Sequence, residues 1–226
     1  MKDAYENFLS SRPLQPGFKK VRYDIPELFL PTLTIDKLEH CYITNYGELN
    51  KSRKLELSHY VVSAFRADSL LESWWQNPQK KLLLLRKCLC ALTFDFSVTS
   101  SMAEARIIES TYKNRWIGCY WQESGVACIP TVSWAGEKTY EICALGIPHG
   151  SPIAISTCGV QDLEMFIKGY NWFMEHIDHA YVICVGKIIA GMKGKIVHFE
   201  HSETFMVDKQ KNDQIPLFEV SRINDL

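Results

Sequence analysis

The sequence predicts an α/β domain of consecutive parallel βα units, TIM-barrel-like or a partial barrel. Strand-like apolar runs begin near positions 59, 91, 126, 152 and 181, and a helical pattern lies in each gap. The clearest unit joins the runs 91–98 and 126–134 through a helical segment at 103–124, and such crossovers are right-handed in nearly all proteins. Because the units follow one another without an obvious reversal, we favour the barrel-like form. An open doubly wound sheet is the alternative.

Three regions are expected along the chain. Residues 1–23 are polar and basic and are broken by prolines and a glycine, and an irregular segment with two prolines follows, so residues 1–35 predict an N-terminal arm. Residues 36–200 carry the patterned elements and form the single α/β domain. Residues 201–226 are polar and poorly patterned, which predicts a loosely held C-terminal tail.

Each element has its own local signal. Apolar or β-branched runs predict strands at 39–46, 57–65, 91–98, 126–134, 152–157 and 181–185, with a hairpin or edge strand within 188–199. Apolar residues at three- and four-residue spacing predict helices at 67–76, 79–88, 103–124, 137–144 and 163–176. The aromatic stripe of the central helix, which includes Trp116 and Trp121, is expected to be core.

Composition indicates an ordinary globular protein. The 226 residues are 46% hydrophobic and 23% charged, and the net charge of -1 does not indicate a nucleic-acid-binding surface. The eight cysteines form no Cys-x-x-Cys motif and lie mostly in apolar runs, which indicates a reducing cytoplasm. No signal-peptide pattern and no apolar run of membrane-spanning length is present, so no membrane partner is expected.

Several segments form a recognisable set of motifs: Asp68, Trp75, Asn77-Pro78, Asp95-Phe96-Ser97, Tyr112–Trp116, Tyr120–Gln122, Gly125, Ile129–Trp134, Gly146–Pro148, Ser156-Thr157, Gly159, Gly169-Tyr170 and Gly186. These motifs resemble the bacterial and phage family catalogued as domain of unknown function 4417. The resemblance covers roughly residues 57–187 and is most specific at 95–134. It implies an origin in a phage or mobile element, and cytoplasm of the host cell as the location, but it implies no reaction. The chain departs from the family pattern at Phe94, Thr99 and Ala103, where proline, tyrosine and proline are expected.

Ligands of parallel α/β folds bind at the carboxyl ends of the strands, so the residues there form the candidate site. Hydroxyls and glycines beside one lysine suit a phosphate, and Trp134 could stack a base or sugar ring. Asp95 has a rival explanation as the hydrogen-bonded start of a turn. The candidate catalytic residues are Asp95, Ser97 and Asp68, and the candidate ligand-binding residues are Arg115, Ser133, Trp134, Ser156, Thr157 and Lys187.

Other chemistries have weaker support. Asp68 and Asp95 would suffice only for one magnesium ion with waters, and the His-x-x-His spacings at 176–179 and 198–201 are better explained as surface or capping histidines, so no metal is assigned. Cys158 is the best-placed thiol but is expected to be a packed cysteine. The glycines do not match the dinucleotide or phosphate-loop spacings, so the cofactor is unknown.

Three functions are compatible with this sequence, and they leave open whether the protein is an enzyme. The favoured one is a role in nucleic-acid metabolism, as a nuclease or replication accessory, through a strand-end phosphate-binding pocket. The second is an interaction protein that inhibits a host defence component. The third is an enzyme or sequestering protein for a nucleotide or other small molecule. The expected partners are accordingly nucleic acid, a phosphorylated small molecule or a host protein.

Overall fold

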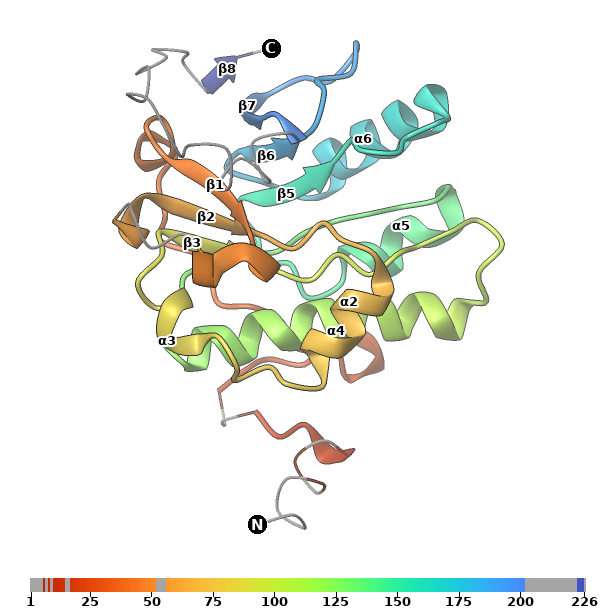
Figure 1. Ribbon diagram of the computed structural model, residues 1–226. Helices are drawn as coiled ribbons and strands as arrows, with labels where there is room; N and C mark the ends of the chain where they lie inside the picture. The colour runs from red at the N-terminus through yellow and green to blue at the C-terminus, as the bar shows by residue number, and fades with distance from the viewer. Residues whose placement is uncertain are drawn as a thin grey trace.

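The computed structural model describes residues 6, 8, 10–14, 17–51, 56–201 and 223–225. Parallel strands and α-helices alternate between residues 60 and 185, which confirms the α/β class (Figure 1). The strands are β1 (Tyr42–Asn45), β2 (Tyr60–Ser63), β3 (Cys90–Leu92), β4 (Cys128–Ile129), β5 (Ile153–Ser156), β6 (Val182–Val185), β7 (Lys195–Phe199) and β8 (Ile223–Asp225). The α-helices are α2 (Asp68–Trp75), α3 (Leu82–Leu85), α4 (Glu104–Glu123), α5 (Glu137–Ala144) and α6 (Leu163–His176), and short 3-10 helices lie at Arg22–Asp24, Ile35–Leu38, Tyr46–Lys51 and Leu57–His59.

The strands pair in the order of the sequence. β1, β2, β3 and β4 form one parallel sheet, and β5, β6 and β7 form a second, to which β8 adds antiparallel. A parallel bridge between Thr131 and Ala154 joins the end of β4 to β5, with hydrogen bonds from Ala154 N to Pro130 O (2.9 Å) and from Val132 N to Ala154 O (2.8 Å). The strand register therefore continues from the first sheet into the second.

Strand side chains alternate between two buried faces, as the period of two requires. One face packs on helices: Val62 and Ala91 contact the core under α2, α3 and α4, while Ile155 and Cys184 contact the core under α5 and α6. The opposite faces of both sheets meet in a third apolar cluster, which contains Ile43, Val61, Leu92, Ile129, Ala154, Ile183, Val185, Val197 and Phe199. Buried apolar contacts thus extend from β1 to β7.

α4 packs closely on the sheet because position 118 is glycine. A Cβ there would lie 2.8 Å from Thr93 Cγ2 and 2.8 Å from Leu28 Cδ2. Trp116 and Trp121 on the same helix are fully buried, as expected for a core stripe. The helix ends before Gly125, whose φ of 78° is the left-handed conformation typical of helix C-termini.

The N-terminal segment lies along α4 on the side away from the strands (Figure 1). Gln122 clamps it by accepting from Phe29 N (2.9 Å) and donating to Phe29 O (2.8 Å). Further along, Trp116 Nε1 donates to Arg12 O (2.8 Å), and Leu28 is buried. The described part of the arm is therefore packed on the domain.

Several boundaries differ from the sequence-based expectations. β3 ends at Leu92 rather than near 98, because Phe94 leaves the sheet and packs among Tyr46, Trp74 and Trp121. β7 runs parallel to β6 and forms no hairpin with it. Between β1 and β2, the described residues contain 3-10 turns and no α-helix. The predicted tail lies outside the described residues, except for its first residue and β8.

Candidate functional site

A cavity of about 700 Å³ opens at the carboxyl ends of β2 to β5. We call it the strand-end pocket. Its walls are the loops that follow these four strands, together with the first turn of α6. The lining residues are Phe65, Arg66, Ala67, Asp95, Ser97, Val98, Thr99, Ser100, Val132, Ser133, Trp134, Ala135, Ser156, Cys158, Gly159, Val160, Gln161, Asp162, Met165 and Phe166.

The lining has a polar part and an apolar part. The polar part carries Asp95 and the hydroxyls of Ser97, Ser133 and Ser156. The apolar part is formed by Trp134 with Val98, Val132, Val160, Met165 and Phe166. A pocket lined by both polar groups and aromatic rings suits a ring-bearing ligand that also carries hydrogen-bonding groups.

Asp95 is the most perturbed carboxyl of the pocket. Its Oδ1 is buried and has no hydrogen-bond partner among the described residues. Burial raises the pKa of Asp95 to about 7; a hydrogen bond from Ser133 opposes the rise, the nearby Asp68 carboxylate adds to it, and Arg115 opposes it. A carboxyl that titrates near neutrality can both donate and accept a proton at physiological pH.

Asp68 organises the loop after β3 and does not line the pocket. Its Oδ1 accepts from Ser97 N (3.0 Å) and from Ser97 Oγ (3.1 Å). Because Asp68 lies in the first turn of α2, these bonds tie the loop to that helix. The structure thus brings all three predicted catalytic residues together, with Asp95 and Ser97 at the pocket wall and Asp68 behind Ser97.

Arg115 lies beside the pocket, fully buried, and does not line it. Its guanidinium donates to the carbonyl oxygens of Thr131 (2.9 Å), Cys143 (2.6 Å) and Leu145 (2.7 Å). It also donates to Asn114 Oδ1, an atom that accepts from Thr93 Oγ1 (2.7 Å) as well. Arg115 therefore fixes the backbone after β4 and at the end of α5, and its geometry fits this positioning role better than the predicted role in ligand binding.

Trp134 is held against α6. Its Nε1 donates to Phe166 O (3.2 Å), and its ring lies 5.1 Å from the Phe166 ring and 5.0 Å from the Phe173 ring. Gly169 makes this approach possible, because a Cβ there would lie 2.2 Å from Trp134 Nε1. The indole is partly exposed and forms part of the pocket wall.

The remaining predicted ligand-binding residues are placed differently from one another. Ser133 and Ser156 line the pocket. Thr157 is buried, and its Oγ1 donates to Lys187 O (2.7 Å). Lys187 is exposed and lies outside the lining, because the chain turns at Gly186 with a φ of 114°.

The polar lining residues that sequence reasoning does not select include Arg66, Cys158 and Asp162. Cys158, expected to be a packed cysteine, is instead the one exposed thiol among the eight, all of which are described and free. Asp162 caps α6 by accepting from Met165 N (2.9 Å). The signal that could have found all three is their position after the carboxyl ends of β2 and β5.

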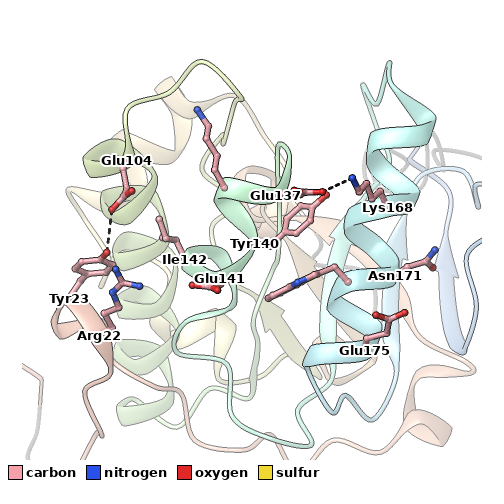
Figure 2. A pocket seen from close by; sticks show the side chains of 12 residues that line it. Arg22, Tyr23, Glu104, Glu137, Tyr140, Glu141, Ile142, Lys168, Asn171 and Glu175 are labelled. Atoms are coloured by element: carbon pink, nitrogen blue, oxygen red, sulfur yellow. Dashed lines mark hydrogen bonds and ion pairs between the residues drawn. The ribbon is translucent and has the colours of Figure 1, made fainter.

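A second cavity of about 640 Å³ lies between α4, α5 and α6 (Figure 2). Tyr23 donates to Glu104 Oε1 (3.3 Å) across it, and Lys168 pairs with Glu137 (2.5 Å). Its four glutamates, which include Glu141 and Glu175, are all at exposed positions, where water screens their charges. This cavity is therefore a weaker candidate for chemistry than the strand-end pocket.

In the part of the chain that the structure describes, no three His, Cys, Asp or Glu side chains lie close enough together to hold a metal ion. The predicted capping explanation fits His176 and His179, whose Nδ1 atoms lie 2.8 Å from Trp172 O and 3.0 Å from Ile177 O. Within the described ranges, none of the helices combines the length and apolar character needed to cross a bilayer.

A model of the family described as "Domain of unknown function (DUF4417)" matches residues 19–202. The chain belongs to this family. The resemblance predicted from the motifs is thus confirmed, and the matched range extends beyond 57–187 at both ends. No solved structure matches this DUF4417 chain.

Curated relatives of the DUF4417 chain come from phages. It is 34% identical over 134 residues to the Gene 1 protein of Mycobacterium phage L5, an alignment that covers 58% of this chain and 57% of the relative. It is 30% identical over 173 residues to the Gene 1 protein of Mycobacterium phage D29, which covers 74% of this chain and 61% of the relative. The chain therefore spans about three fifths of the length of these relatives, which support the predicted phage origin.

Proposed function

We propose that the chain is an enzyme of phage nucleic-acid metabolism that binds a base-bearing ligand in the strand-end pocket and uses Asp95 to transfer a proton. One observation carries the proposal: a carboxyl with a pKa of about 7, and with a buried oxygen that has no partner among the described residues, lines a large pocket at the carboxyl ends of parallel strands. Perturbed carboxyls concentrate at functional sites, and ligands of this fold class bind at these strand ends.

Several neighbours give Asp95 a defined environment. Ser133 hydrogen-bonds its carboxyl, and the Asp68–Ser97 bonds hold the adjacent loop. The buried network of Arg115 and Asn114 fixes the backbone at Thr131, two residues before Ser133. Such support is what a group needs to keep one geometry during proton transfer.

The nucleic-acid part of the proposal rests on the aromatic side of the pocket and on the phage relatives. Trp134 offers an apolar ring surface, and stacking of a base on an aromatic side chain contributes about 1–3 kcal/mol to binding. The near-neutral net charge favours a small ligand over a long oligonucleotide, since extended binding to phosphates needs many cations.

Cys158 provides a test that works before any ligand has been identified. It lines the pocket and is exposed, so its alkylation by N-ethylmaleimide, followed by intact mass, reports occupancy. A panel of nucleobases, nucleosides, nucleotides, short oligonucleotides and sugar phosphates is added. A true ligand at ten times its Kd slows the reaction about tenfold if the bound form does not react. A panel in which no compound slows alkylation contradicts the proposal.

Asp95→Asn tests the proton-transfer role once a ligand is found. The wild-type pH profile of turnover is expected to bend near pH 7, and the variant is expected to lose turnover while keeping its fold. Asp36→Asn, an exposed aspartate far along the sequence from the pocket loops, is the matched control. Full turnover in Asp95→Asn would exclude Asp95 as the proton-transferring group.

Two wider expectations belong to the same proposal. The strands in sequence order, the bridge at Thr131 and the apolar cluster shared by β1 to β7 support a partial barrel of βα units, since an open doubly wound sheet would reverse its strand order. Eight free cysteines support a reducing compartment, which for a phage protein is the host cytoplasm.

A further inference from the structure

The strand-end pocket also carries information on the class of its ligand. Its apolar residues include a held aromatic ring, because Trp134 donates to Phe166 O and packs against Phe166 and Phe173 of α6. A planar ligand ring laid on the indole removes apolar surface of both rings from water. The loss of side-chain entropy is small, because the contacts with α6 already hold the indole in place.

Gly169 determines how closely Trp134, the aromatic wall of the strand-end pocket, packs on α6. With hydrogen at this position, the indole edge lies directly on the backbone of α6, where a methyl group would come within 2.2 Å of Nε1. That distance is far below any van der Waals contact, so a larger residue must push Trp134 away from α6. Gly169 is therefore a positioning residue for the aromatic wall.

The polar side of the pocket suits the edge of a nitrogen heterocycle. Asp95 lines the pocket, its carboxyl is hydrogen-bonded by Ser133, and the Ser133 and Ser156 hydroxyls lie in the same lining. Depending on its proton, the carboxyl accepts from a ring N–H or donates to a ring nitrogen, and the hydroxyls do either. An edge with alternating donors and acceptors satisfies these groups together.

The charges around the pocket disfavour a phosphate. The N-terminus of α6, the usual anion site beside such a strand, is capped by Asp162, whose Oδ1 accepts from Met165 N (2.9 Å). Asp162 and Asp95 line the pocket against one cation, Arg66, among the described lining residues, and Lys187 lies outside. A phosphate dianion would thus meet a capped helix and two carboxyl groups.

From this arrangement we infer that the ligand is an uncharged nitrogen heterocycle without phosphate, a nucleobase or nucleoside, whose ring stacks on Trp134 and whose hydrogen-bonding edge meets Asp95. The inference deepens the proposed function and rests on it. It also replaces the phosphate expected from the hydroxyls and Lys187 with a neutral group.

Matched pairs of ligands test the inference in the full chain. Each nucleoside is compared with its own 5′-monophosphate, and each with the free base, by protection of Cys158 from N-ethylmaleimide and by calorimetry. The expected result is binding of at least one base or nucleoside at least about tenfold tighter than its monophosphate. Monophosphates that bind more tightly would overturn the inference and leave the proposed function standing. Binding by no compound would overturn both.

Gly169→Ala tests the role of the aromatic wall formed by Trp134. The added methyl group is expected to displace Trp134 and weaken base binding at least about tenfold. Lys168→Ala is the matched control, because Lys168 is the adjacent exposed residue and pairs with Glu137 at the second cavity. This variant is expected to bind the base as tightly as the wild type does. Unchanged binding in Gly169→Ala would overturn the role of the aromatic wall. If Gly169→Ala fails to fold, Trp134→Leu keeps an apolar wall without a large ring, and its unchanged base affinity would overturn the same role.

Discussion

The ionisation of Asp95 can be measured through protein stability, without any ligand. Asp95→Asn replaces the carboxyl with a neutral group of the same shape. The pKa of Asp95 is about 7 in the folded protein against an ordinary value of 3.8, mainly because burial disfavours the charge. Below about pH 3.8 the carboxyl is protonated in both the folded and the unfolded state. Above pH 7 it is ionised in both, and the folded state must bury a carboxylate.

The sign and size of the effect follow from this difference. Because the folded pKa is raised, the contribution of Asp95 to stability is full at low pH and is lost as pH rises from about 4 through 7. With about 1.36 kcal/mol for each pH unit between the two values, the loss is about 1.7 kcal/mol by pH 5 and about 4 kcal/mol by pH 8. The difference between the free energies of unfolding of Asp95→Asn and the wild type should therefore shift by about 2.5 kcal/mol in favour of the variant from pH 5 to pH 8.

Urea unfolding of both proteins at pH 5, 6, 7 and 8 measures this difference in the free energy of unfolding, which we call the gap. The offset between the proteins at any one pH also contains the hydrogen bonds of the new amide, so the change of the gap with pH is the informative quantity. Asp36→Asn, at an exposed position, is the control and should show a constant gap. A gap for Asp95→Asn that is also constant from pH 5 to pH 8 would refute the burial argument and remove the basis for proton transfer by Asp95.

Three further predictions concern the scaffold that holds the pocket. Gly118→Ala should lower the free energy of unfolding by about 1–3 kcal/mol, measured in urea, because its methyl group meets Leu28 and Thr93 at 2.8 Å; an unchanged midpoint would show that α4 can shift freely. Asp68→Ala should remove the two bonds to Ser97 at a loss of about 1–3 kcal/mol and speed amide exchange at Ser97, whereas Ser69→Ala, at the exposed neighbour, should do neither. Trp116→Phe should lose the bond to Arg12 O, about 1 kcal/mol, and speed proteolysis of the N-terminal segment; equal cleavage rates would contradict the clamping role of Trp116.

The helices could be predicted more closely than the strands. α5 and α6 begin and end at the predicted residues, because a glycine and a capping aspartate precede them and their apolar spacing is regular. The apolar run at 91–98 predicts too long a strand at β3, since such a run does not reveal whether its backbone pairs in a sheet. Phe94 is buried as predicted for a strand, but its ring packs in an aromatic cluster outside the sheet.

The candidate site shows the same division. The rule that ligands bind at strand ends located Asp95, Ser97, Ser133, Trp134 and Ser156, and all five line one pocket. The rule gives position along the chain and not the direction of a side chain, so it also selected Lys187, which lies beyond a turn at Gly186, outside the lining. The effect of the Asp162 cap on anion binding could not be predicted from the sequence either, because it depends on whether the N-terminus of α6 faces the pocket.

The buried polar residues beneath the pocket reduce the free-energy cost of ionising Asp95 but do not cancel it. Arg115 is fully buried and donates to neutral carbonyl and amide oxygens, and the electrostatic effect of its charge on Asp95 is to favour the carboxylate. Arg115 therefore partly offsets the burial that disfavours the Asp95 carboxylate, while the protonated form leaves one buried cation held by hydrogen bonds. Both states are tolerable, which is the condition for a group that must change protonation in each cycle. A ligand that donates an N–H to the Asp95 carboxylate would favour the ionised form further, so base binding should strengthen as pH rises through 7.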